Sequence, residues 1–289
     1  MNKHMKKSFS RLLTSILCII MFFSIIGCNN SKNENKATKS PDVFPITDDE
    51  SSEDYAKHFR IIKDLNVAGS GQFTPAQLKN ATDKIGSDLS ITVVDLRLEP
   101  HGFINSSPLS FYKKDGKINS GLTTEETISE ETNKLAQLNN ENTLTLYDKN
   151  GNEVGTKDIE RVYSEQTLCN ELKLKYMRFA TEYEEVPSTK TVDDFVSFIL
   201  NEPKNSFLYI HDFNGEARTT TFMAMVDIMK NYKSTSFESV IEKHFKKSGF
   251  DLKSDTKTYN FLEGFYKYCT ESTDLLKISY STWIKSKNS

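Results

Sequence analysis

An aspartate and an arginine placed six residues apart, Asp212 and Arg218, are the residues of this 289-residue sequence best placed to handle an anion. The loop that carries them, residues 211–218, follows a short apolar run at 207–210 that is typical of a buried strand. Apolar residues at helical spacing come next and predict a helix beginning at residues 219–221. Such a loop gathers free backbone N–H groups and the positive end of the helix dipole, and an arginine adds a two-pronged donor. The pattern predicts an anion pocket.

The loop also matches a known motif. His211, Gly215, Arg218 and Thr219 agree position for position with H-C-x-x-G-x-G-R-T. The loop therefore resembles the phosphate loop of cysteine-dependent phosphatases, and most closely that of the protein-tyrosine-phosphatase-like (PTP-like) phytases, which are inositol polyphosphate phosphatases. By this resemblance the phosphate-binding loop consists of His211, Asp212, Phe213, Asn214, Gly215, Glu216, Ala217, Arg218 and Thr219. Two positions depart from the motif, because Asp212 replaces the nucleophilic cysteine and Ala217 replaces the second glycine.

A second landmark of that family follows a predicted strand at 91–96. Asp95 and Arg97 resemble its aspartate–arginine pair, and Glu99 and His101 lie in its Glu-x-His-Gly turn. The resemblance implies that Arg97 and His101 brace the wall of the loop. The residues by themselves favour a purely structural pairing of Asp95 with Arg97.

A third landmark is an acidic loop after a predicted strand at 176–181. Glu182 stands where the family places its general-acid aspartate, and Pro187 follows five residues later, one residue further than usual. A carboxylic acid in this position would protonate the leaving oxygen of a phosphate ester. The alternative interpretation is a solvated acidic loop.

The fold implied by the resemblance is α/β, with a PTP-like central sheet flanked by helices and a small β-rich insert. The phosphatase domain is assigned to residues 53–289 and the insert to 105–165. Thr74 and Pro75 predict a helix start, and Asn150-Gly151 predicts a hairpin with a type I′ turn. Further helices are expected at 125–138, 192–200, 237–245 and 259–269.

The first 27 residues predict export. They carry four basic residues, no acidic ones, and an apolar run at 12–26 that is short for a membrane span. The run ends at Cys28 in a sequence that resembles a bacterial lipobox, which implies a lipid on Cys28 and an extracytoplasmic, membrane-anchored protein. An ordinary cleaved signal with an incidental cysteine is the alternative. Residues 28–52 are predicted to form a disordered tether.

Charge and cysteine content exclude other classes. Loss of the four basic residues changes the net charge from −3 to −7, which argues against a nucleic-acid partner. Cys169 and Cys269 have no arginine six residues later, so neither begins a second phosphate loop, and both are expected in the core.

Asp212 changes the chemistry expected of the loop. The parent mechanism uses a thiolate whose pKa is lowered by the loop dipoles. A carboxylate is a weaker nucleophile, and at ~4 Å with an effective dielectric of ~20 its charge would repel an anionic phosphate by ~4 kcal/mol. Glu216 would add to this repulsion unless it points to solvent. Asp212 can instead take the place of the anion, accept N–H bonds of the loop and pair with Arg218.

Two functions follow from these residues. The first is a pseudophosphatase without cysteine catalysis that binds phosphate-type anions or a partner protein. The alternative is an active phosphomonoesterase that uses Asp212 or Glu182 on inositol phosphates or phosphotyrosine. No cofactor or metal is expected. Enzymes that form an aspartyl phosphate use a divalent cation, but Glu182 and Glu216 are the only candidates to hold one and neither is clearly placed for it. The expected partner is a phosphorylated small molecule or a phosphoprotein.

Overall fold

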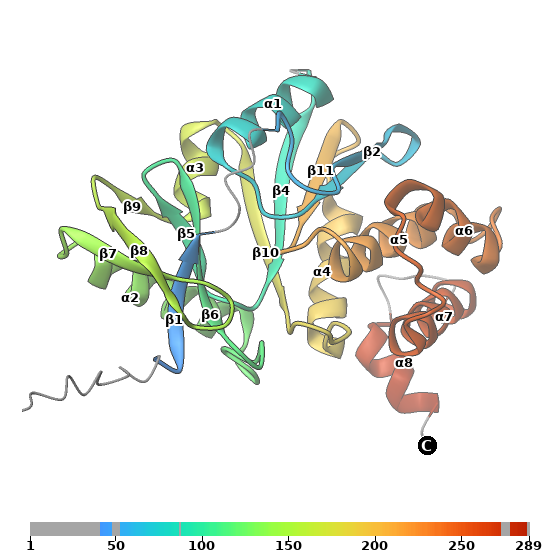
Figure 1. Cartoon of the computed structure of the whole chain (residues 1–289). Helices are drawn as coiled ribbons and strands as arrows, with labels where there is room; N and C mark the ends of the chain where they lie inside the picture. Colours follow the sequence, from blue (N-terminus) through green and yellow to red (C-terminus); the bar gives the residue numbers. More distant parts are fainter. Residues whose placement is uncertain (1–40, 48–52, 87, 273–277, 288–289) are drawn as a thin grey trace, which may run out of the picture. The chain divides into compact units, whose positions relative to one another are not determined.

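The computed structural model describes residues 41–47, 53–86, 88–272 and 278–287 (Figure 1). The predicted export signal, Cys28 and most of the predicted tether lie outside these residues. Within them, no helix combines the length and the apolar character that a membrane crossing requires.

A five-stranded central sheet positions the loop. Its strands, in order across the sheet, are β10 (Lys175–Thr181), β4 (Ser90–Arg97), β11 (Ser206–His211), β3 (Val67–Ser70) and β2 (Arg60–Ile62). All neighbouring pairs are parallel except β2 with β3. His211, at the end of β11, pairs in register with Asp95 and with Ser70. The carboxyl ends of three strands therefore meet at the start of the phosphate loop, the edge where open α/β sheets bind ligands.

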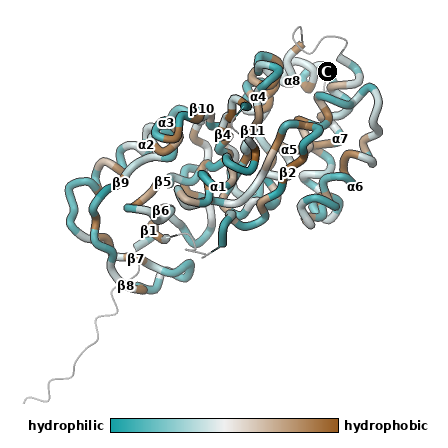
Figure 2. Tube along the Cα trace, turned by 90° about the horizontal axis from the view of Figure 1, so that it is seen from above, coloured by the Kyte–Doolittle hydropathy of each residue, from teal (hydrophilic) through white to brown (hydrophobic). Residues whose placement is uncertain are grey.

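Successive side chains of the central strands point to opposite faces of the sheet, where they pack in two separate hydrophobic cores. Ile210 and Val94 join a core with the helices of one face, whereas Tyr209 and Val93 join a core on the other face. The first face carries α4 (Thr189–Asn201), α5 (Ala217–Asn231), α6 (Phe237–Ser248), α7 (Thr256–Glu271) and α8 (Tyr280–Lys287). The second face carries α1 (Pro75–Ile85) and α3 (Glu165–Glu171). Figure 2 shows the apolar stretches gathered along these inner strands and along α5.

A smaller β-rich part has its own core. Its four-stranded sheet runs β1 (Val43–Thr47), β6 (Ser107–Lys113), β5 (His101–Ile104) and β9 (Val162–Tyr163). A separate hairpin, β7 (Thr143–Tyr147) and β8 (Glu153–Asp158), and helix α2 (Thr124–Leu138) complete it. A 3₁₀ turn, η1 (Lys63–Leu65), links β2 and β3.

Two of the predicted boundaries are wrong. The tether was expected to be disordered through residue 52, but Val43–Thr47 is a strand that pairs antiparallel with β6. Phe44 and Ile46 are both buried, Phe44 against the rings of Tyr112 and Tyr147, and burial of these two side chains accounts for the order. The β-rich part also takes β5 from before residue 105, so it is not confined to the insert at 105–165.

The predicted hairpin turn has a different geometry. Gly151 donates to the carbonyl of Asp148 and has φ +78°, whereas Asn150 is not among the residues with positive φ. The turn is therefore of type I followed by a left-handed glycine, not type I′. The carboxylate of Asp148 accepts the backbone N–H groups of Asn150 and Asn152, which favours this conformation.

Other predictions are confirmed. Thr74 caps α1 in a capping box with Gln77, and the proline follows at the first helical position. Cys169 and Cys269 are both free and buried, and burial raises the pKa of the Cys269 thiol to about 12. Both cysteines are therefore core residues and not nucleophiles.

Candidate active site

The phosphate loop occupies the turn between β11 and α5, and its shape depends on Gly215. This residue has φ +80°, and a Cβ there would lie 2.2 Å from the backbone nitrogen of Gly71. Only glycine fits such a position. Ala217 is already the first residue of α5, two residues before the expected start. The substituted motif glycine therefore falls where the backbone is helical, and Ala217 needs no positive φ.

Arg60 holds the loop from outside. Its guanidinium donates to the carbonyl of Gly215 at 2.7 Å and to the hydroxyl of Thr220 at 2.9 Å. His58 Nδ1 donates to the carbonyl of Asn214 at 2.8 Å. Burial lowers the pKa of Arg60 to about 10, so the guanidinium stays charged at neutral pH. Sequence reasoning missed Arg60, because no motif links it to a loop about 155 residues away.

Asp212 turns back into the loop. Its side chain is buried, Oδ1 accepts the backbone N–H of Gly215, and Oδ2 lies 3.4 Å from Nε of Arg218. An amide of the loop and the arginine are the donors that would hold phosphoryl oxygens in the parent site. In this chain a carboxylate of the protein uses both.

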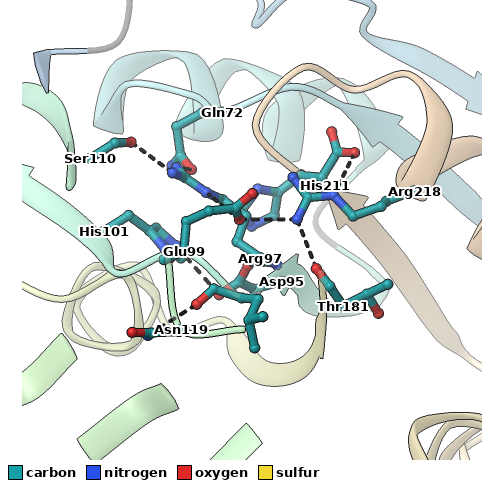
Figure 3. Close-up of polar contacts among 12 residues, drawn as sticks. Gln72, Asp95, Arg97, Glu99, His101, Ser110, Asn119, Thr181, His211 and Arg218 are labelled. Atoms are coloured by element: carbon teal, nitrogen blue, oxygen red, sulfur yellow. Dashed lines mark hydrogen bonds and ion pairs between the residues drawn. The ribbon is translucent and has the colours of Figure 1, made fainter. Parts of the chain in front are cut away.

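Nε and Nη1 of Arg218 both have acceptors within the protein. Its Nη1 donates to Oε2 of Glu99 at 3.0 Å and to the carbonyl of Thr181 at 2.9 Å, contacts that Figure 3 shows. Burial by itself would raise the pKa of Glu99, but Arg218 and Arg97 outweigh it and lower that pKa to about 2. Glu99 is thus a charged partner of Arg218, a role that the sequence did not reveal.

A buried chain of charges lies behind the loop. Oε1 of Glu165 lies 2.7 Å from Nε2 of His211, and Oε2 lies 3.5 Å from Nε2 of His101. Oδ2 of Asp95 lies 3.4 Å from the same nitrogen of His101 and 3.1 Å from Nε of Arg178. Burial lowers the pKa of His211, but Glu165 more than compensates and raises it. Neither Glu165 nor Arg178 belongs to a motif used in the sequence analysis.

Two of these carboxylates and one histidine form the one group in the described residues that has metal-ligand spacing. Ligand atoms of Asp95, His101 and Glu165 lie within 4.8 Å of one another. Asp95 is already neutralised by Arg178 and Glu165 by His211. The donor set therefore suits a buried ion-pair network better than a divalent cation.

Arg97 lies against the front of the loop. Its guanidinium donates to Oε1 of Gln72 and to Oγ of Ser110, both at 2.7 Å, and lies 5.0 Å from the centre of the Phe213 ring. The backbone N–H of Arg97 donates to Oδ1 of Asp95. Arg97 thus contacts the loop, as the family resemblance implies, and its link to Asp95 includes the backbone.

A narrow cavity of about 70 Å³ opens beside Phe213. Aromatic side chains border it together with charged ones, and the lining includes Arg97, Glu99, Tyr112, Lys149, Tyr183 and Phe213. Nζ of Lys149 lies 4.5 Å from the centre of the Phe213 ring. The mouth of the site is therefore both aromatic and basic.

Neither Glu182 nor Glu216, the other two acidic candidates, has its carboxylate in contact with Asp212 or Arg218 in the described residues. Glu182 accepts hydrogen bonds from the hydroxyl of Ser120 and lines a cavity of about 460 Å³ whose lining contains no residue of the phosphate loop. Tyr183 is the residue of the acidic loop that lies over Arg218, with the guanidinium 5.8 Å from its ring centre. Glu216 is half-exposed and lies 3.7 Å from Nε2 of His58, so its charge points away from the pocket.

Comparisons with known proteins agree with this fold and loop. A family model for PTP-like phytase, described by the substrate name inositol hexakisphosphate, matches residues 94–230. The effector protein hopD2 of Pseudomonas syringae pv. tomato is 27% identical over 243 residues, covering 77% of this chain and 52% of that protein.

Solved structures give the same result. A PTP-like myo-inositol phosphatase of Mitsuokella multacida, in complex with myo-inositol-(1,3,4,5)-tetrakisphosphate, is 26% identical with a TM-score of 0.80, covering 86% of this chain and 48% of that one. A PTP-like phytase of Bdellovibrio bacteriovorus is 25% identical with a TM-score of 0.74, covering 85% of this chain and 96% of that one. The chain thus spans about half the length of the Pseudomonas and Mitsuokella relatives.

The central sheet, the loop between β11 and α5, and its arginine define a phosphatase-type α/β protein. Together with the family match and the two structural likenesses, they show that the chain belongs to the PTP-like phytase family.

Proposed function

We propose that this protein is a pseudophosphatase of the PTP-like phytase family that serves as a binding module. One observation carries the proposal: the carboxylate of Asp212 accepts the N–H of Gly215 and pairs with Arg218 inside the loop. These are the donors that a phosphate needs. A ligand must displace Asp212, or bind at the loop mouth, before it can use them.

The chemistry of Asp212 supports the same conclusion. A fixed negative charge at ~4 Å opposes an entering phosphate by ~4 kcal/mol at an effective dielectric of ~20, about three decades in affinity. Enzymes that use their own aspartate as the nucleophile and form an aspartyl phosphate neutralise this charge with a divalent cation. The cations around this loop include Arg218 and Arg97, both engaged with Glu99, and Arg60, engaged with the carbonyl of Gly215.

The ligand class follows from the relatives. One of them is a myo-inositol phosphatase with a bound inositol tetrakisphosphate. A polyanion of that type, bound weakly at the basic mouth beside Lys149 and Phe213, is the small-molecule ligand we assign to this chain. A phosphoprotein would present the same phosphate chemistry.

The proposed location is the outer face of a membrane, with a lipid on Cys28 as the anchor. The basic, then apolar, stretch before Cys28 supports it. A Cys28→Ala variant expressed in the native cell should move from the membrane fraction to the soluble fraction. An unchanged distribution would contradict the anchor.

Phosphate release from inositol hexakisphosphate tests the proposed function, with the wild-type protein measured beside an Asp212→Cys variant, with and without magnesium. We expect no release by the wild type and measurable release by the cysteine variant. If neither protein releases phosphate, a cysteine at position 212 is not enough for catalysis, and the proposed binding role would remain.

Turnover by the wild type would overturn the proposal and favour the alternative, an active phosphomonoesterase. An Asp212→Asn variant would then show whether Asp212 is the nucleophile, since its rate should fall to background. An unchanged rate would leave Glu182, and magnesium dependence would indicate a metal-assisted carboxylate.

A further inference from the structure

A second recessed surface follows the outermost strand of the central sheet. Four consecutive residues of β10, 176–179, form its floor, and side chains of α2 and α4 form its walls, including Glu125, Ile128 and Asp194. The cavity measures about 540 Å³ and its lining contains no residue of the phosphate loop. We call it the β10 trough. Its volume falls in the range of roughly 300–1,000 Å³ that is usual for ligand sites.

The floor of the trough is the edge of a sheet. β10 pairs with β4 on its inner side and stands last in the strand order, between α2 and α4 (Figures 1 and 2). At its far end the N–H of Ala180 donates to the hydroxyl of Thr124, a side chain of α2, at 3.2 Å. An edge strand offers backbone donors and acceptors to a further strand, and extended peptides commonly bind in this way.

Apolar side chains are exposed in the same place. Met177 on the floor is 41% exposed and Ile128 on the α2 wall is 37% exposed. Phe198 of α4 lines the trough as well and is only partly buried. These side chains come from three separate elements and form one surface, so they can receive the apolar side chains of an added strand.

Charges of both signs line the trough, and the acidic excess lies toward the adjoining cavity. Glu125, Asp194, Lys190 and the buried Arg178 line the trough, and Arg178 is neutralised by Asp95 and Glu131. The adjoining cavity, which shares Glu125, Asp194 and Lys190, adds Glu182 and Glu185. Lys190 pairs with Asp194 at 2.7 Å, and Lys257 pairs with Glu185 at 2.7 Å. In the part of the chain that the structure describes, Glu125 and Glu182 enter no ion pair, so a cationic partner is favoured.

We propose that the β10 trough binds an extended segment of a partner protein, in which apolar and basic residues alternate, by adding it as a strand to β10. Alternation follows from the strand period: one set of side chains meets Met177 and Phe198 on the α4 side, and the other meets Glu125 and Ile128 of α2. A second copy of this chain is a poor occupant, because two acidic troughs would then face each other. The proposal does not depend on Asp212.

A short peptide tests the proposal directly. The probe is an eight-residue fluorescein-labelled peptide of alternating valine and lysine, added to the purified protein and followed by fluorescence anisotropy. We expect saturable binding that weakens with salt. The same peptide with N-methyl groups on alternate residues cannot form the ladder of hydrogen bonds and should bind at least about tenfold more weakly. A valine–glutamate peptide should not bind.

Variants of the protein locate the site. Glu125→Lys should weaken binding about tenfold through charge, and Met177→Ser about fivefold through lost apolar contact. Glu141→Lys is the matched control, since it makes the same charge change at an exposed position outside the trough and should leave affinity unchanged. Circular dichroism melting curves should show that all three variants remain folded.

Several results would overturn the proposal. They are absence of binding up to about millimolar peptide, equal binding of the N-methylated or glutamate peptides, and equal effects of Glu125→Lys and Glu141→Lys. A dimer in light scattering that Met177→Ser dissociates would identify a second copy as the occupant instead. None of these readouts involves phosphate release, so failure here is distinguishable from failure of the pseudophosphatase assignment.

Discussion

Behind the phosphate loop, each buried carboxylate lies between two basic side chains: Glu165 between His211 and His101, and Asp95 between His101 and Arg178. In front of the loop, the donors that a ligand would use face Asp212. The back is built as support and does not depend on a ligand. In front of the loop, Asp212 takes up the N–H of Gly215 and the Nε of Arg218 when no ligand is bound.

This contrast shows where the departures from the family motif fall. His211, Gly215 and Arg218 match the motif, and each has a structural task that persists without catalysis. Asp212 stands at the reacting position, and Glu182 lines a different cavity. The supporting residues agree with the motif while the residues at the reacting positions differ from it, a pattern that supports the pseudophosphatase we propose.

The largest effect should come from the back of the loop. A Glu165→Ala variant leaves His211 and His101 without their shared carboxylate in a fully buried place, and we expect a loss of about 3–5 kcal/mol of unfolding free energy. Urea denaturation measures it. In the same variant the pKa of His211 should fall, because the carboxylate that raises it is gone, and NMR titration of the imidazole can follow this. A loss below about 1 kcal/mol would contradict the supporting role.

A smaller effect is expected at Glu99, which joins the two regions. Its folded pKa of about 2 lies below the ordinary 4.5, so its stabilisation is complete above pH 4.5 and is lost as the pH falls toward 2. This shift corresponds to at most about 3 kcal/mol. The unfolding free energy of Glu99→Gln should therefore depend less on pH between 5 and 3 than that of the wild type. An unchanged slope would mean that Glu99 does not hold Arg218.

The smallest effect is expected at Glu216. Its pair with His58 lies on the surface, with the two side chains 45% and 42% exposed, so Glu216→Gln should change the unfolding free energy by less than about 0.5 kcal/mol. In an Asp212→Ser background, the same substitution should change phosphate affinity by less than about threefold, because the charge points outward. A tenfold gain would show that Glu216 acts inside the loop.

Local patterns predicted most of the fold. The apolar run of β11, the capping box at Thr74 and the β-branched run of β4 each carry their information within a few residues. Strand β1 was missed because a short apolar segment beside polar neighbours resembles a tether until its pairing with β6 is known. Arg60, Glu99, Glu165 and Arg178 were missed as site residues for a related reason, since their partners are far away in the sequence.

The sequence shows that Asp212 and Arg218 share one loop, and it also led to the hypothesis that Asp212 fills the anion pocket and pairs with Arg218. The outward direction of Glu216 and the placement of Glu182 beside Ser120 could not be predicted, because both depend on how separate loops pack.

The most direct test of the account is a calorimetric titration of the wild-type protein and an Asp212→Ser variant with inorganic phosphate. Serine keeps a small polar side chain but removes the charge that engages Gly215 and Arg218. We predict no measurable binding by the wild type and a gain of about three decades in affinity for the variant, the size expected for removal of ~4 kcal/mol of repulsion. Equal affinity of the two proteins would contradict the claim that Asp212 fills the phosphate site.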